Sequence, residues 1–333
     1  CFVDECDRCD HCGEYHTNDN LHTDDHNTTI CDRCYERYYF RCDGCGDIIH
    51  CDYAYGNDYG TYCESCFEEC DDNNNDSEYI HGYCYKPHAR FYQNPGEITN
   101  NRFFGVEVEI DKGSDRSALA DKLNKHDEIY LKEDGSLTES GFEIVSHACS
   151  LQYHMHDLDW EGIFNLCKEY GYSSHDARTC GLHVHISKDA FGSTPWEIDG
   201  NLAKMLYLIN THWDKVITFS RRTQTQLECW AAKYSNINYT VDTIEDGLKK
   251  AKDYNAHSRY VAINLQNTYT IEIRVFRGTL NLESFYAAIQ FCDILVDLCM
   301  RPIDEVQRLS WADIRNYGSK YNEFTSYCTR RGI

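Results

Sequence analysis

Residues 103–111 read FFGVEVEID, which places Glu107 and Glu109 two residues apart inside an apolar run. In a β-strand, successive side chains point to opposite faces, so both carboxylates share one face while Val106 and Val108 occupy the other. Glutamate is a poor strand former, and two of them in an apolar strand need an explanation. Either the strand is half exposed with a solvated outer face, or the carboxylates belong to a binding site.

Three later stretches repeat this pattern with complementary chemistry. Each has an apolar face and a face of charged or imidazole side chains. They are FEIVS at 142–146, GLHVHIS at 181–187 and TIEIRVF at 270–276. The chain is therefore predicted to be α+β, with an antiparallel sheet, helices on its apolar face and an open polar face. Two further strands are predicted at 129–132 and 259–265, and helices at 114–125, 158–170, 195–219, 282–300 and 304–317.

The predicted polar face gathers four carboxylates, two histidines and two arginines. Carboxylates this close repel one another unless cations bind between them, and Mg²⁺ or Mn²⁺ prefers oxygen ligands with an imidazole tolerated. Such a set suits a polyphosphate held by metal ions, with arginines neutralising the transferred phosphoryl group. Metal-dependent hydrolysis by the same groups is the alternative. The residues are Glu107, Glu109, Glu143, His183, His185, Glu272, Arg274 and Arg277; Arg221 and Arg222 either reach this site or face solvent.

The N-terminal part contains 13 of the 20 cysteines, mostly in Cys-x-x-Cys pairs. CDHCG at 9–13 recurs as CDGCG at 42–46, and CDRC at 31–34 recurs as CESC at 63–66, so the segment is an internal repeat. Each repeat supplies four thiolates for one structural zinc ion, which stabilises a unit too small to bury a sufficient core. The predicted ligands are Cys9, Cys12, Cys31 and Cys34 for one ion, and Cys42, Cys45, Cys63 and Cys66 for the other.

This sequential pairing resembles LIM-like zinc ribbons, and a cross-braced RING-type pairing is the competing arrangement. Several other cysteines and histidines are spare ligands that can replace a cysteine at either site. They are Cys6, Cys51, Cys70, Cys84, His16, His22, His26, His50 and His81. Cys1 lies 33 residues before Cys34 and matches the last ligand of a preceding repeat, so we expect a further zinc unit before it.

The charge is as unevenly distributed as the cysteines. Of the formal net charge of −23, residues 1–80 contribute 21 Asp and Glu against four Arg and no Lys. Such a surface repels phosphate backbones, which disfavours nucleic acid and favours a basic protein or peptide as the partner. No apolar run is long enough to span a membrane. Paired cysteines beside a domain of apparent active-site residues favour a reducing compartment, so we predict the cytoplasm.

Composition and turn formers divide the chain into three parts. Residues 1–69 form the tandem zinc module and residues 70–101, with DDNNNDSE and NPGEITNN near their ends, form an ordered connector. Residues 102–333 form the second domain. At 333 residues the chain is long enough for this organisation.

Six motifs occur in the second domain in the order FGVEVEI, KEDGSL, GFEIVS, GLHVHIS, RYVAINL and TIEIRVFRGTL. In this order they resemble the amidoligase family, whose members are carboxylate–amine ligases similar to glutamine synthetase and glutamate–cysteine ligase. Amidoligases attached to LIM-like zinc ribbons also occur in this family, notably in phage and other mobile-element proteins. The resemblance spans residues 103–280, and it implies a glutamine synthetase-like sheet and a bacterial or phage-infected cell as the setting.

The resemblance also implies an activity and roles for the site residues. A carboxylate would attack the γ-phosphate of ATP to give an acyl phosphate, and an amine of a peptide, protein or smaller compound would displace phosphate. Glu107 and Glu109 would bind Mg²⁺, with Glu143 and Glu272 completing metal or amine-side contacts. One histidine, His183 in preference to His185, would contact the nucleotide-bound metal. Arg274 and Arg277 would stabilise phosphate, Asp134 would lie near the incoming amine, and Asn264 matches a motif position. A non-enzymatic adaptor is the remaining alternative.

Overall fold

The computed structural model describes residues 6–333 except 18–19, 25–26, 58–59, 65, 68–78, 83–84, 139, 178, 234–247 and 249–260. Within these limits the chain divides into two compact units, Cys1–His88 and Ala89–Ile333. The division falls inside the predicted connector 70–101, so one part of that segment belongs to each unit. Cys1, Cys70, Cys84 and His26 lie outside the described residues.

In its described residues the first unit consists of short hairpins, short helical segments and the two-residue strand β9 (Ile80–His81). The strand pairs are β1 (Cys6–Arg8) with β2 (Tyr15–Thr17), β3 (Leu21–Thr23) with β4 (Thr29–Cys31), β5 (Tyr39–Arg41) with β6 (Ile48–His50), and β7 (Tyr55–Asn57) with β8 (Gly60–Tyr62). Helix α1 (Asp32–Tyr38) follows β4 directly. The buried residues of its first half are mainly cysteines and isoleucines, among them Cys9, Ile30 and Cys34. Such a small apolar core agrees with a unit that needs another source of stability.

The internal repeat in the sequence is also a repeat in backbone hydrogen bonding. The Gly13 N–H donates to the Cys9 carbonyl at 2.9 Å, and the Gly46 N–H donates to the Cys42 carbonyl at the same distance. Both glycines have a positive φ, +74° and +81°, which most other residues adopt only with strain. The equivalent aspartates, Asp10 and Asp43, each accept a backbone N–H from the second half of their own repeat. The two repeats therefore share one local fold.

The second unit is built on a large sheet with the strand order β16-β17-β15-β11-β13-β12. Every neighbouring pair along this path is antiparallel. The strands are β11 (Phe104–Ile110), β12 (Ile129–Lys132), β13 (Phe142–Ser146), β15 (Gly181–Ser187), β16 (Ile263–Asn264) and β17 (Thr270–Arg277). The sheet is mixed, however, because β10 (Phe91–Tyr92) pairs with β14 (Ala148–Cys149) in parallel. The prediction of an antiparallel sheet is thus wrong for this one pair of short strands.

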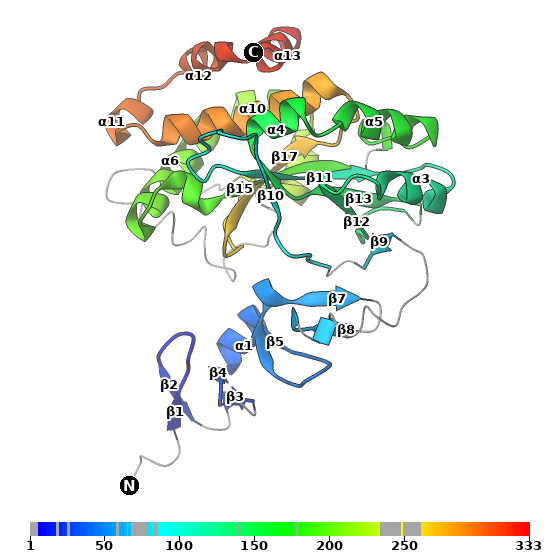
Figure 1. Ribbon diagram of the computed structural model, residues 1–333. Coiled ribbons are helices and arrows are strands. Elements are labelled where there is room, and N and C mark those ends of the chain that lie inside the picture. Colours follow the sequence, from blue (N-terminus) through cyan, green and yellow to red (C-terminus); the bar gives the residue numbers. More distant parts are fainter. Residues whose placement is uncertain are drawn as a thin grey trace. The chain divides into compact units, whose positions relative to one another are not determined.

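Helices cover the apolar face of this sheet, as predicted from the alternation of the strands. The long α10 (Leu282–Cys299) lies over the sheet with α4 (Leu151–His156), α5 (Trp160–Glu169) and α6 (Pro195–Thr211), and α12 (Trp311–Tyr317) and α13 (Asn322–Arg331) lie beyond α10 (Figure 1). The strand residues beneath are fully buried, for example Val106, Val184 and Ile273. Further α-helices among the described residues are α3 (Arg116–Leu123), α7 (Trp213–Ser220), α8 (Gln224–Trp230) and α11 (Ile303–Val306).

Two predicted helices are each divided in the structure. The predicted helix 195–219 is interrupted at His212, which has φ −101° and ψ 29°, so that α6 and α7 are separate elements. The predicted helix 304–317 is α11 followed by α12, which starts at a capping box formed by Ser310 and Asp313. Among the described residues, no helix has both the length and the apolar content needed to cross a membrane.

Candidate functional site

The strand register brings the predicted polar residues together on one face. Glu109 pairs with Glu143 across β11 and β13, Glu107 pairs with His183 across β11 and β15, and His185 pairs with Glu272 across β15 and β17. The strand alternation had suggested an open face for these side chains, and this prediction was wrong. Glu109 and Glu143 are each 4% exposed, and His183 and Glu272 are each 5% exposed. The cluster is therefore a buried polar site, in which each charge needs a compensating partner.

Glu107, His183 and Glu272 form the first group of the site. Their nearest nitrogen and oxygen atoms all lie within 4.8 Å of one another. His183 Nδ1 lies 3.0 Å from Glu107 Oε2 and 3.5 Å from Glu272 Oε1. His185 contacts only the edge of this group, with its Nε2 3.1 Å from Glu107 Oε1. Asn264 donates to Glu272 Oε2 at 3.0 Å, which orients that carboxylate from β16.

Glu109, Asp134 and Glu143 form the second group, again with oxygen atoms within 4.8 Å of one another. Asp134 comes from the turn after β12, and its carboxylate also accepts the Ser136 backbone N–H at 2.6 Å. His183 Nε2 lies 3.6 Å from Glu109 Oε1, so its imidazole stands between the two groups. Of the two histidines, His183 is thus the one placed to contact ligands of both groups.

The two groups differ in how their negative charge is compensated. Burial raises the pKa of Glu107, but the neighbouring His185 and His183 outweigh it and hold the pKa well below its usual range. Burial is similarly outweighed at Glu272, where Arg274 lowers the pKa. In the second group, burial raises the pKa of both Glu109 and Glu143, and nearby carboxylates add to the effect. Full ionisation of the second group is therefore disfavoured, because its carboxylates together would carry more negative charge than their neighbours neutralise, although Lys132 Nζ lies 3.8 Å from Glu143 Oε2.

This donor set fits hard divalent cations. The groups offer carboxylate oxygens and one imidazole within a few ångströms, which are ligand types that Mg²⁺ and Mn²⁺ accept. A cation near the second group would supply the missing positive charge and favour the ionised carboxylates. Glu107, His183 and Glu272 would hold one ion, and Glu109, Asp134 and Glu143 another.

Arg274 and Arg222 lie beside the acidic groups, whereas the contact of Arg277 is with a backbone carbonyl. Arg274 forms an ion pair with Glu272, and Arg277 donates to the His175 carbonyl at 2.7 Å. Arg222, which the sequence left between site and solvent, proves to be a site residue: a Cβ added to Gly181 would lie 2.5 Å from Arg222 Nη2, 2.9 Å from His183 Nε2 and 3.4 Å from Glu109 Oε1. The missing side chain of Gly181 therefore leaves the space in which these three groups meet.

Arg221 has a different environment from Arg222. It adopts a left-handed conformation with φ 62° at the end of α7, and its guanidinium donates to the carbonyls of Arg277 and Gly278. This contact supports the chain after β17. Arg222 is brought to the site by the turn between α7 and α8, two helices that pack against β17. The sequence pattern did not predict this turn.

The structure brings the cysteines together in the sequential pairing. The sulfurs of Cys9, Cys12, Cys31 and Cys34 form one group and those of Cys42, Cys45, Cys63 and Cys66 a second, whereas a cross-braced arrangement would mix the pairs. Cys12 Sγ lies 3.9 Å from Cys31 Sγ, and Cys45 Sγ lies 3.8 Å from Cys63 Sγ. Four sulfurs at about 2.3 Å from a tetrahedral zinc ion are about 3.8 Å apart, while a disulfide needs about 2.05 Å. The thiol groups thus fit zinc rather than disulfides.

The described spare ligands have other contacts. His16 Nε2 lies 3.8 Å from Cys12 Sγ, and His16 forms a potential ligand group with Cys12 and Glu14. His22 pairs with Asp32 at 2.9 Å, and His50 and His81 stack on neighbouring aromatic rings. Cys6 is exposed and Cys51 is half-buried.

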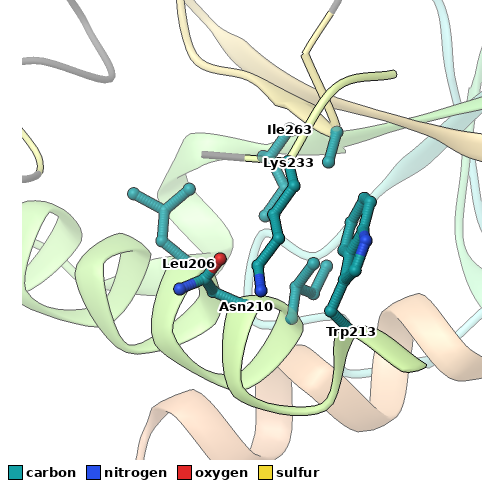
Figure 2. Close-up of a pocket in the computed structure, with 7 residues that line it drawn as sticks. Leu206, Asn210, Trp213, Lys233 and Ile263 are labelled. Atoms are coloured by element: carbon teal, nitrogen blue, oxygen red, sulfur yellow. The ribbon is translucent and has the colours of Figure 1, made fainter. Parts of the chain in front are cut away.

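A small pocket lies on the other face of the sheet. It is lined by residues of α6, α7 and β16, including Asn210, Trp213 and Ile263 (Figure 2). Ile263 precedes Asn264 in β16, so its side chain points away from the acidic cluster. Asn210 Oδ1 and Trp213 Nε1 are buried and have no hydrogen-bond partner among the described residues. The pocket is therefore separate from the candidate site.

Comparison with known proteins gives a family and a distant structural likeness. The family described as "Putative amidoligase enzyme" matches residues 114–296. Curated protein sequences give no match. A crystal structure of the complex between the prokaryotic ubiquitin-like protein Pup and its ligase PafA is similar at 12% identity and a TM-score of 0.29. That likeness covers 70% of this chain and 59% of the other.

Proposed function

Because the chain belongs to the amidoligase family, we propose that its second unit is an ATP-dependent carboxylate–amine ligase. An oxygen of the substrate carboxylate attacks the γ-phosphorus of ATP, the bond from that phosphorus to the bridging oxygen breaks, and ADP leaves. The product is an acyl phosphate. The amine nitrogen of the second substrate then attacks the acyl carbon, inorganic phosphate leaves, and the nitrogen loses a proton as the amide or isopeptide bond forms.

The site residues are assigned to this reaction by their chemistry. Glu107, His183 and Glu272 would hold one divalent cation, and Glu109, Asp134 and Glu143 a second. These ions, Mg²⁺ or Mn²⁺, supply positive charge against the phosphates when bound. Arg222, Arg274 and Arg277 would stabilise the phosphoryl group as its charge changes. Asn264 holds the Glu272 carboxylate in place, and Asp134 lies where it can also attract a cationic amine.

A single observation supports this proposal most strongly. His183 lies between two buried carboxylate groups, 3.0 Å from Glu107 on one side and 3.6 Å from Glu109 on the other. Burying several carboxylates costs several kcal/mol per charge unless cations compensate them. Phosphoryl transfer from a metal-bound nucleotide is a chemistry that uses such a site, and the family match favours it over metal-dependent hydrolysis.

Glu109→Gln tests the assignment, with Glu305→Gln on the exposed surface of α11 as the control. We expect wild-type protein and control to be stabilised by Mg²⁺ with a non-hydrolysable ATP analogue more than by Mg²⁺ alone in a thermal-shift measurement. Glu109→Gln should keep its fold but lose most of this extra shift and the ATP turnover. Normal ATP turnover by Glu109→Gln would contradict the assignment. Activity that does not depend on ATP would instead support a metal-dependent hydrolase, and no effect of ATP on any variant would support an adaptor.

The first unit is proposed to bind two zinc ions and to dock a protein partner or substrate. Its cysteine groups fit tetrahedral zinc, and its excess of acidic residues favours a basic surface. The thiols must stay reduced, so this proposal also places the protein in a reducing compartment such as the cytoplasm. Metal analysis after dialysis should find two zinc ions per chain. Fewer than two would contradict the two-site proposal.

A further inference from the structure

Asp111 is a buried carboxylate for which the proposed reaction has no role. It follows β11 directly and lies on the same face as Glu107 and Glu109, because side chains two residues apart share a face. Its exposure is 0%, so it is the most deeply buried of these three. The motif that contains Glu107 and Glu109 ends with this residue.

Within the part of the chain that the structure describes, the oxygens of Asp111 are bound by neutral donors, mainly from two loops, and not by a cation. Thr138 donates through its hydroxyl and, at 3.3 Å, through its backbone N–H. The Thr179 hydroxyl donates at 2.8 Å, and the Lys112 N–H donates at 2.7 Å. Asp111 therefore acts as an anionic acceptor for two hydroxyls, unlike the glutamates before it.

These contacts join three chain segments at the Asp111 carboxylate: the end of β11 and two loops. The first loop, residues 133–141, joins β12 to β13, and the second, residues 172–180, leads into β15. Asp111 and Ser173 exchange backbone hydrogen bonds of 2.8 and 3.0 Å, which fixes the second loop. The Tyr172 hydroxyl donates to the Ser140 carbonyl at 2.8 Å and ties the second loop to the first.

Both loops deliver groups to the second acidic group of the site. The first carries Asp134, which must reach Glu109 and Glu143 from outside the sheet. The ion pair between Arg116 and Glu133 fixes this loop before Asp134, and the hydrogen bond from the Thr138 hydroxyl to Asp111 fixes it after Asp134. The second loop ends at Gly181, whose N–H donates to Glu109 Oε2 at 2.5 Å. Asp111 is thus linked to Asp134 through the hydroxyl of Thr138 and to Gly181 through the hydroxyl of Thr179, and both Asp134 and Gly181 lie beside Glu109.

We infer that Asp111 is a positioning residue that sets Asp134 and Gly181 around Glu109, so that the second group can hold a divalent cation. This inference rests on the proposed function, because it assumes that Glu109, Asp134 and Glu143 bind a metal ion. Asp111 itself does not touch metal, nucleotide or substrate. Its effect passes through the hydroxyls of Thr138 and Thr179.

The test removes one hydroxyl at a time and leaves the carboxylate in place. Thr138→Val and Thr179→Val delete a donor at nearly constant volume, Thr138→Ser keeps it, and Thr218→Val in α7 controls for the same change away from the site. Mn²⁺ binding to the full chain is measured by titration calorimetry without nucleotide, and the melting temperature is recorded for each variant. Loss of partners that orient metal ligands typically costs about 10- to 100-fold in metal affinity.

We expect Thr138→Val to weaken Mn²⁺ binding at the second site about 10-fold or more, Thr138→Ser to restore it to within about twofold, and Thr218→Val to have no effect. Unchanged Mn²⁺ affinity in both valine variants with a lowered melting temperature would overturn the inference and leave Asp111 a purely structural residue. Glu109→Gln separates the two failures. If it abolishes binding while the valine variants bind normally, the proposed function stands and the inference fails. If it also binds normally, the metal site and the inference fall together.

Discussion

The two units hold their candidate metal groups in opposite ways. In the first unit each group of four thiols comes from Cys-x-x-Cys turns that lie within one repeat, and the same hydrogen bonds recur in both repeats. In the second unit the carboxylates come from β11, β13, β17 and a loop, and residues as far apart in sequence as Glu107 and Glu272 meet only through the sheet register. The first kind of site has soft thiolate ligands that are close in sequence. The second has hard oxygen ligands that only the tertiary structure brings together.

This difference indicates what each metal would do. Thiolates from a small unit with a minor apolar core suit a closed zinc site that stabilises the fold. Oxygen ligands on a sheet with a large independent core suit cations that serve a reaction and leave the fold nearly unchanged. Four measurements, from the largest expected effect to the smallest, can break or sharpen this contrast.

Removal of zinc should have the largest effect and should act on the first unit alone. A strong chelator at neutral pH is expected to unfold residues 6–67, because structural zinc contributes roughly 10 kcal/mol or more to folding in small zinc units. Hydrogen exchange read by peptide should show full loss of protection there and unchanged protection in β11 and α10. Equal loss in both units would show that the second unit also depends on a chelatable metal for its fold.

Replacement of Glu272 by glutamine should lower the activity of the second unit and leave the fold of the first unit unchanged. Glu272 contacts His183, Arg274 and Asn264, so the change removes a charge from the centre of the first group. We expect ATP turnover to fall about 100-fold or more, because metal and phosphate contacts contribute several kcal/mol to transition-state stabilisation. The zinc content and the melting temperature of the first unit should not change. A loss of zinc in this variant would argue against independent metal sites.

Mild acid should destabilise the second unit through a buried histidine. The Trp160 indole donates to His154 Nδ1 at 3.2 Å, so His154 is neutral and its Nε2–H donates to the Phe104 carbonyl at 2.9 Å. Burial lowers its pKa to about 4, against about 6.5 in an unfolded chain. Because the unfolded state binds the proton more readily, stability falls as the pH drops from about 6.5 to 4, by about 3 kcal/mol.

The control for this effect is the exposed His156 on the same helix. Denaturant unfolding of the second unit at pH 7 and pH 4 should show a smaller pH dependence for His154→Gln than for wild type, and an unchanged one for His156→Gln. An unchanged dependence in His154→Gln would assign the acid sensitivity to another group, such as His147, whose pKa burial also lowers to about 4.

Loss of a helix cap should give the smallest effect and shows how the second unit distributes its stability. Thr194 caps α6 in a capping box with Glu197. Thr194→Ala is expected to cost about 1 kcal/mol of unfolding free energy, a small fraction of the contribution of one zinc ion. Urea denaturation measures it, and Ser326→Ala, at an exposed position in the middle of α13, serves as the comparison. A collapse of the fold on loss of this cap would contradict a stability spread over a large core.

Much of the second unit follows from the strand alternation alone. The strands at 129–132, 142–146 and 181–187 agree with β12, β13 and β15, because each has an apolar face that a helix layer buries. The helix break at His212 and the parallel pairing of β10 with β14 have no comparable periodic pattern. Arg222 escaped assignment for a similar reason, since its place depends on the turn between two helices and on the space above Gly181.

The stretch FFGVEVEID shows which properties of the site can be predicted from sequence and which depend on tertiary structure. Alternation alone places Glu107, Glu109 and Asp111 on one face, and the repeated Cys-x-x-Cys spacing alone groups the thiols. Only the packed sheet decides that Glu107 faces histidines, that Glu109 faces carboxylates and that Asp111 collects hydroxyls from two loops. The reason is physical: the period of a strand fixes the direction of a side chain, but the neighbours of a buried charge come from other strands and loops and set its chemistry.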